Sequence, residues 1–251
     1  MAVINLEIKD AIARVKSILS ASYDGSLRSP AFLLAVSGGP DSQALLKAFP
    51  HVCAEFVGVK CIACGIDHGL RPEANSELNL AEDLASTMGV PFIRSQVHIN
   101  GTSNIQCKAR DARYERLYEI ANTHECDYVV TAHHFDDKAE TVLIRIIRGE
   151  GMGSLAVLPM ISGRILRPLL NVTRANIMGY VKRWNLKFAI DPSNMNPHYL
   201  RSKVRHEIFP LLESINPNIK RRLVNLSDEI SAHENVKKFV CEELAAMVMK
   251  Q

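Results

Sequence analysis

Short apolar runs alternate with segments of helical period along most of this chain. The runs are rich in Val, Ile, Leu and Phe and are bounded by Gly, Pro or charged residues, as is typical of buried strands. They span residues 32–36, 56–66, 92–98, 128–131 and 164–167. Because each run is followed by a helix-period segment, the pattern predicts an α/β fold with a doubly wound, mainly parallel sheet and helices on both faces.

The two ends of the chain are expected to be helical. Residues 5–16 carry charges where a signal peptide has an apolar stretch, and no run of 18 apolar residues occurs, so we expect an amphipathic helix in a cytoplasmic protein that does not enter a membrane. Pro210 and Pro217 precede a helical pattern over residues 219–249. We therefore expect a catalytic domain over residues 1–212 and a short C-terminal helical extension over residues 213–251.

The first apolar run leads into a turn that suits an anion. Its sequence is Ser37-Gly38-Gly39-Pro40-Asp41-Ser42. The glycines allow a sharp turn and close approach to a ligand, and the proline suits a first helical turn, whose N–H groups would face phosphate oxygens. The hydroxyls add donors, and the carboxylate can hold Mg²⁺ against a pyrophosphate. The alternative is a turn with no ligand. The pattern is neither G-x-x-x-x-G-K-[ST] nor G-x-G-x-x-G, and it resembles the S-G-G-x-D-S loop of the N-type ATP pyrophosphatases.

The second run ends in a polar turn, Asp67-His68-Gly69-Leu70-Arg71. Such a strand end can place Asp67 and Arg71 over the same crevice as the first loop, although it can equally be a capped connection to the next helix. Cys61 and Cys64 lie three apart on this run, so their side chains should point to opposite faces of a strand. We expect core cysteines there rather than a metal site, and reduced thiols for all six cysteines.

Two later segments carry polar helix faces. In the first, Gln106, Arg110 and Arg113 lie on one stripe, where the arginines can grip phosphates or pair with acidic neighbours at the surface. The second follows the run 128–131, and there Asp137 and Glu140 are expected opposite a buried stripe. That stripe is Ala139, Val142, Leu143 and Ile146.

The second segment suits a cation, because carboxylates near a helix N-terminus are stabilised by the helix dipole. The cation is either Mg²⁺ or the ammonium group of an amine substrate. A transition-metal cluster is the alternative. It would use His133, His134, Asp136 and Asp137.

Positive charge gathers in the second half of the chain. The net charge is +3, but residues 144–222 hold 14 Lys and Arg against 4 Asp and Glu, an excess of 10. This is either a solvated basic face or the electrostatic footprint of a polyanion. Glycines at 149, 151 and 153 allow a mobile segment that closes on substrate, and Arg201 and Arg205 share one helix face.

Six motifs occur in the order seen in tRNA(Ile)-lysidine synthases, and the chain resembles that family over about residues 30–212. They are the loop 37–42, the turn 67–71, the helix segment 109–114, the segment 133–141, Arg148-Gly149-x-Gly151 and the helix from Arg201 to Arg205. The resemblance implies an adenine nucleotide alpha hydrolase-like fold and an ATP-dependent ligase. Such a ligase joins L-lysine to C2 of cytidine 34 in the CAU anticodon of an isoleucine tRNA. It forms lysidine through an adenylated base and releases pyrophosphate and AMP.

The same resemblance implies roles for individual residues. ATP would be bound by Ser37, Gly38, Gly39, Pro40, Asp41, Ser42, Asp67, Arg71, Arg113 and His133, with Mg²⁺ on Asp41. Lysine would be bound by Asp137 and Glu140, and tRNA by Arg148, Arg201, Lys203 and Arg205. The catalytic set would be Asp41, Arg113, His133, Asp137 and Arg205. A homodimer is compatible with the sequence.

The chain departs from the family pattern at two positions: Lys138 stands where Gln is usual and Ser202 where Asn is usual. Lys138 should point away from the pair Asp137 and Glu140. Three other functions stay open. A tRNA thiolase would need reactive cysteines near the crevice, a metal-dependent phosphoesterase would leave the first loop without a role, and a non-enzymatic RNA-binding module would be indifferent to ATP.

Overall fold

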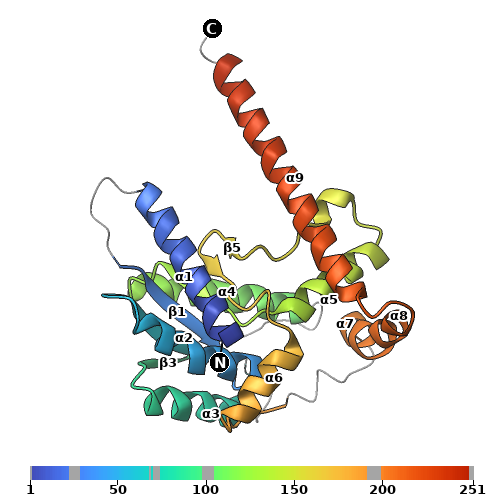
Figure 1. Ribbon diagram of the computed structural model, residues 1–251. Coiled ribbons are helices and arrows are strands. Elements are labelled where there is room, and N and C mark those ends of the chain that lie inside the picture. The colour runs from blue at the N-terminus through green and yellow to red at the C-terminus, as the bar shows by residue number, and fades with distance from the viewer. Residues whose placement is uncertain are drawn as a thin grey trace. The chain divides into compact units, whose positions relative to one another are not determined.

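The computed structural model describes residues 2–22, 29–67, 69, 74–97, 105–190 and 199–248 (Figure 1). The chain packs into two compact units: Met1–His134 with Met160–Asp191, and Phe135–Pro159 with Pro192–Gln251. The expected boundary at residue 212 falls inside the second unit, and it stays a prediction. No helix in the described part of the chain has both the length and the apolar character needed to cross a bilayer.

The first unit is built on a six-stranded sheet with strand order β3-β2-β1-β4-β6-β5. The strands are β1 (Ala31–Val36), β2 (Lys60–Asp67), β3 (Phe92–Gln96), β4 (Tyr128–Val130), β5 (Ile161–Ser162) and β6 (Ile165–Leu166). All neighbouring pairs are parallel except the β5–β6 hairpin. The expected mainly parallel α/β sheet is therefore confirmed, although the short hairpin turning at Gly163 was not expected.

Helices cover both faces of this sheet because β1 is apolar on both sides. The helices are α1 (Ala2–Ser22), α2 (Pro40–Cys53), α3 (Ala74–Thr87), α4 (Ile105–Thr123) and α6 (Arg174–Arg183). Phe32 and Leu34 pack with residues of α1, α2, α3 and α6, whereas Leu33 packs with residues of α4. The alternation of side chains along one strand thus feeds two separate cores.

The second strand begins later than its sequence predicts. Residues 56–59 form turns rather than strand, with Gly58 at φ +77° and Val57 93% exposed. The expectation of a strand over residues 56–59 is therefore wrong. Val57 is apolar but lies at an exposed turn, so its hydrophobicity alone suggested a buried strand.

The cysteines of β2 do point to opposite faces, as expected. Cys64 belongs to the core beneath α4, where burial raises its thiol pKa to about 12, and Cys61 packs against the other core. Cys61 lies beside Cys53, and a hydrogen bond between the two thiols raises the pKa of Cys53, which burial raises further.

The second unit is helical. It contains α5 (Phe135–Ile147), the 3₁₀ turn η1 (Met152–Leu155), α7 (Leu200–Lys203), the π-helical turn η3 (Val204–Ile208), α8 (Phe209–Ile215) and α9 (Ile219–Val248). Buried residues from α5, η3, α8 and α9 form its core. Ile146 is 43% exposed, so its assignment to the buried stripe of α5 is wrong. Lys138 is 6% exposed and pairs with Asp228 of α9, so it does point away from Asp137 and Glu140.

Candidate active site

The loop after β1 owes its shape to one glycine. Gly38 has φ +73°, and a Cβ there would lie 2.2 Å from the carbonyl oxygen of Glu77. Any side chain would therefore be strained and would collide with the backbone of α3. Gly39 is different, since its φ is −71° and a Cβ would come no closer than 3.7 Å, to Ser37 Oγ. The backbone turn therefore requires glycine at position 38 and not at position 39, where only the close approach of a ligand would favour it.

Hydrogen bonds within the first unit hold this loop, Ser37–Ser42, which we call the phosphate loop. Ser42 Oγ donates to the Gly39 carbonyl at 2.9 Å and lies 3.2 Å from the Ser37 N–H, which donates to it. The N–H of Ala189 donates to the Gly38 carbonyl at 3.0 Å. Since α2 begins at Pro40, the N–H groups of its first turn have no acceptor inside the helix. The loop thus presents N–H groups of the kind that phosphate oxygens accept from.

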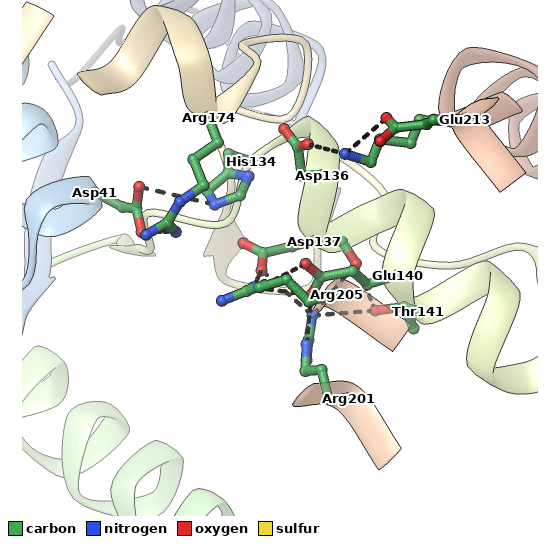
Figure 2. Close-up of polar contacts among 11 residues, drawn as sticks. Asp41, His134, Asp136, Asp137, Glu140, Thr141, Arg174, Arg201, Arg205 and Glu213 are labelled. Atoms are coloured by element: carbon green, nitrogen blue, oxygen red, sulfur yellow. Dashed lines mark hydrogen bonds and ion pairs between the residues drawn. The ribbon is translucent and has the colours of Figure 1, made fainter. Parts of the chain in front are cut away.

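Asp41, in the first turn of α2, faces two cationic or ionisable groups (Figure 2). Its carboxylate lies 3.4 Å from Arg174 Nη1 and 3.8 Å from Nε2 of the buried His134. His133 instead lies with Nδ1 2.8 Å from the Thr131 hydroxyl. One carboxylate beside a phosphate loop fits a Mg²⁺ ion that takes its other oxygens from phosphates and water.

Sequence reasoning missed Arg174. Arg174 lies in the first turn of α6. It directly follows the N-cap residue Thr173, whose hydroxyl accepts a hydrogen bond from the Asn176 N–H at 3.2 Å. The helix dipole disfavours a cation in that position. The sequence does contain one indication of this: an arginine directly after an N-cap threonine is unfavourable unless another interaction compensates for it.

The structure describes two more of the residues that were predicted to bind ATP. Asp67 Oδ1 accepts the N–H of Gly69 at 2.8 Å, so its carboxylate caps its own turn. Arg113 is half-buried in α4, and burial lowers the pKa of its guanidinium. Arg71 lies outside the described residues.

Four charged side chains meet in the second unit, and we call them the carboxylate–arginine cluster. They are Asp137 and Glu140 of α5, Arg201 of α7 and Arg205 of η3. Glu140, whose side chain is 3% exposed, receives Arg205 on both oxygens at 2.6 and 2.9 Å and Arg201 on one at 2.8 Å (Figure 2). Asp137 lies 3.3 Å from Arg201 and 3.6 Å from Arg205.

This cluster balances two carboxylates with two guanidiniums. A nearly enclosed carboxylate such as Glu140 needs that compensation, because burying an unpaired charge is costly. An incoming ammonium group would have to join the cluster or displace a guanidinium. Arg201, at 42% exposure against 24% for Arg205, is the more accessible of the two.

The other basic residues assigned to tRNA are exposed. Arg148 is 61% exposed and lies 4.0 Å from Glu150, and Lys203 is exposed on α7. The sequence also left a transition-metal cluster open as an alternative. Within the described ranges, no group of three or more His, Cys, Asp or Glu side chains could hold a metal ion.

A model of the PP-loop domain family matches residues 9–212. The chain belongs to the PP-loop family. This is the family in which the phosphate loop is expected, so the resemblance drawn from the motifs is confirmed at that level.

Several relatives are named tRNA(Ile)-lysidine synthase. The chain is 30% identical to the one from Bacillus subtilis over 88% of its own length and 48% of that protein. It is 38% identical to the one from Thermobifida fusca and 39% to the one from Rhodopseudomonas palustris, over 76% and 73% of its own length and 59% and 55% of theirs. The chain thus spans about half the length of the curated relatives it matches.

Among solved structures, the U34-tRNA thiolase NcsA from Methanococcus maripaludis superimposes with a TM-score of 0.70. The match covers 92% of this chain and 80% of the thiolase, at 19% identity. This similarity shows a shared fold.

Proposed function

We propose that this PP-loop chain carries the catalytic part of a cytoplasmic tRNA(Ile)-lysidine synthase. The observation that carries the proposal is the identity of 30–39% with proteins of that name over 73–88% of the chain. The geometry supports the proposal. The first unit contains the phosphate loop with the carboxylate of Asp41, and the second contains the carboxylate pair of Asp137 and Glu140, which binds cationic groups.

In the proposed first step the phosphate loop holds ATP. The C2 oxygen of cytidine 34 attacks the α-phosphorus, and the bond from that phosphorus to the bridging oxygen of the β-phosphate breaks, so pyrophosphate leaves. Backbone N–H groups of α2 and the side chain of Arg113 stabilise negative charge on the phosphates. Mg²⁺, when bound at Asp41, would add a positive charge to the same oxygens.

In the proposed second step the ε-amine of L-lysine attacks C2, and AMP leaves with the former carbonyl oxygen. The amine must first lose a proton, and the roles of Asp137 and Glu140 in binding it stay a prediction. The contacts of Glu140 with two arginines support a version in which the substrate ammonium replaces Arg201, the more exposed cation, beside Asp137.

The tRNA is the proposed partner of the basic surface. Arg148 and Lys203 are exposed and can reach backbone phosphates, whereas Arg201 and Arg205 are engaged with carboxylates. The target base lies in a single-stranded loop, where leaving the stack costs little.

The test is incubation with ATP, labelled L-lysine and an isoleucine tRNA with a CAU anticodon, followed by nucleoside mass analysis. We expect a lysyl addition on cytidine 34. Asp41→Asn should lower AMP formation by about 100-fold or more, with tRNA binding retained, and Asp83→Asn, an exposed carboxylate of α3, should change nothing. In a parallel incubation with ATP, tRNA and sulfide but no lysine, replacement of oxygen by sulfur would support the thiolase instead, and tRNA binding without ATP consumption would leave only a binding module.

A further inference from the structure

Helix α9 lies beyond residues 9–212, which match the PP-loop domain family, yet it packs against α5 in the core of the second unit. Lys220, Val224 and Asp228 follow one another at intervals of four, so they share one face of α9. Val224 belongs to the core that residues of α5 also enter. The two charged residues of this face each pair with a residue of α5.

The two ion pairs have opposite directions. In the first, Lys220 Nζ lies 3.2 Å from Asp136 of α5 and 3.0 Å from Glu213 of α8. Burial acts to lower the pKa of Lys220, but hydrogen bonds and charges from Glu213 and Asp136 raise it above its ordinary value, so the amine stays charged. In the second pair α9 supplies the carboxylate: Asp228 receives the Nζ of Lys138, whose side chain is only 8% exposed.

These pairs hold the two sequence neighbours of Asp137. Successive side chains of an α-helix project about 100° apart, so Asp136 and Lys138 leave α5 about 200° apart, with Asp137 midway between them. Ala139, which shares the core with α9, projects into the other arc. Asp137 and Glu140 therefore lie on the side of α5 away from α9, and Asp136 points away from both (Figure 2).

This arrangement resists rotation of α5 about its own axis. A turn in either direction would lengthen one of the two ion pairs, and the enclosed ammonium of Lys138 would be costly to leave unpaired. Rotation is the motion that would swing Asp137 and Glu140 away from a bound ammonium group. Misplacement of a substrate by about 1 Å can lower a rate by about 100-fold, so the direction of these carboxylates matters for catalysis.

Further contacts join α9 to the segment that follows α5. Ser227 is fully buried, and its hydroxyl accepts the Val157 N–H at 3.1 Å. The same segment is tied back to α5, because Arg145 donates to the Ser154 carbonyl and lies 3.6 Å from Glu150. Helix α5, this segment and α9 thus hold one another, which keeps the register of α9 against α5.

We infer that α9 is a positioning element of the lysine subsite and acts through Lys220 and Asp228. By holding both neighbours of Asp137, it fixes the direction in which Asp137 and Glu140 meet the substrate ammonium. The inference rests on the proposed function, since it takes L-lysine as the second substrate. It extends the site to a helix beyond residue 212, to which the motifs gave no role.

The test separates the lysine-dependent step from the step before it. Single-turnover release of pyrophosphate from ATP and tRNA without lysine reports the first step, and the KM for L-lysine in the complete reaction reports the second. Asp228→Ala is the main variant, because this carboxylate is 58% exposed and can be removed without opening the core. We expect its KM for lysine to rise about 10-fold, with pyrophosphate release and the KM for ATP unchanged. Lys220→Gln should act in the same direction.

Two further variants and a melting curve complete the design. Asp228→Glu keeps the carboxylate and should return the KM for lysine close to its wild-type value. Glu229→Gln is the matched control, since Glu229 is an exposed acid next to Asp228 on α9, and it should behave as wild type. Thermal melting of each variant reports whether it is folded.

An unchanged KM for lysine in normally melting Asp228→Ala and Lys220→Gln variants would overturn the inference. Equal losses in pyrophosphate release and in lysine transfer would overturn it as well, because α9 would then support the fold as a whole. Either result, obtained with an active wild type, removes only the role of α9. If wild type attached no lysine to the tRNA, the proposed function would fail and the inference with it.

Discussion

In the phosphate loop the backbone makes the site, whereas in the carboxylate–arginine cluster four side chains make it. The loop depends on the φ of +73° at Gly38 and on hydrogen bonds made by Ser42 over at most five residues. The cluster joins Glu140 to arginines 61 and 65 residues further along the chain. A site of the first kind is encoded mainly by neighbouring residues, with one long-range hydrogen bond from Ala189, whereas a site of the second kind exists only when distant helices have packed.

The largest effect is expected at Gly38, where substitution tests the loop as a backbone device. Gly38→Ala should lower the free energy of unfolding by about 3–5 kcal/mol, because the new Cβ adds a clash with Glu77 to an unfavourable φ. It should also abolish ATP binding. Chemical denaturation and calorimetry measure the two effects.

Gly39→Ala is the matched control for that variant. Its φ and its 3.7 Å clearance permit alanine, so stability should stay within about 0.5 kcal/mol of wild type. Equal destabilisation by both substitutions would contradict the distinction drawn between the two glycines.

A smaller effect is expected when the carboxylate–arginine cluster is broken. Glu140→Gln should lower the free energy of unfolding by about 1–3 kcal/mol, because it removes the negative charge and one of the two oxygens that accept from Arg201 and Arg205. The loss stays moderate because both guanidiniums can reach water. Asp228→Asn, which weakens the pairing of the buried Lys138 elsewhere in the same unit, provides the comparison. A neutral Glu140→Gln would show that the cluster does not support the fold.

The smallest effect concerns the exposed cations. Arg148→Gln and Lys203→Gln should each reduce the log–log slope of RNA affinity against salt by about 0.7, the value for one lost phosphate contact to a single strand. Arg205→Gln should reduce it less, since Glu140 holds that guanidinium. Fluorescence anisotropy over a range of NaCl concentrations measures the slopes, and a larger change at Arg205 would mean that it leaves the cluster to bind RNA.

The sequence was sufficient for the class of the sheet, mainly parallel with helices on both faces, and for the glycine turn of the phosphate loop, because both follow from local patterns. Alternating burial along β1 and the pair Gly38 and Pro40 need only neighbouring residues to be interpreted. The two-sided placement of Cys61 and Cys64 follows from strand geometry in the same way.

Long-range pairing could not be predicted. No residue near Asp41 in the sequence indicates its contact with Arg174, which lies 133 residues later. Helical periodicity likewise cannot show that Arg201 and Arg205 face Glu140 rather than solvent. The start of β2 was misplaced for a related reason, since the exposure of Val57 depends on a turn that hydrophobicity alone does not reveal.

The hydrogen bond from Ala189 to Gly38 has a consequence for how the protein is made. The first unit consists of two stretches of chain, and β6 together with Ala189 is synthesised after the twenty-five residues 135–159 that belong to the other unit. While the ribosome is still adding residues 135–159, β4 is an unprotected edge of the nascent sheet, and the phosphate loop lacks its hydrogen bond from Ala189. The phosphate loop therefore gains this tie only after residue 189 has been synthesised, and a chain stopped shortly after residue 134 would leave the β4 edge open to aggregation.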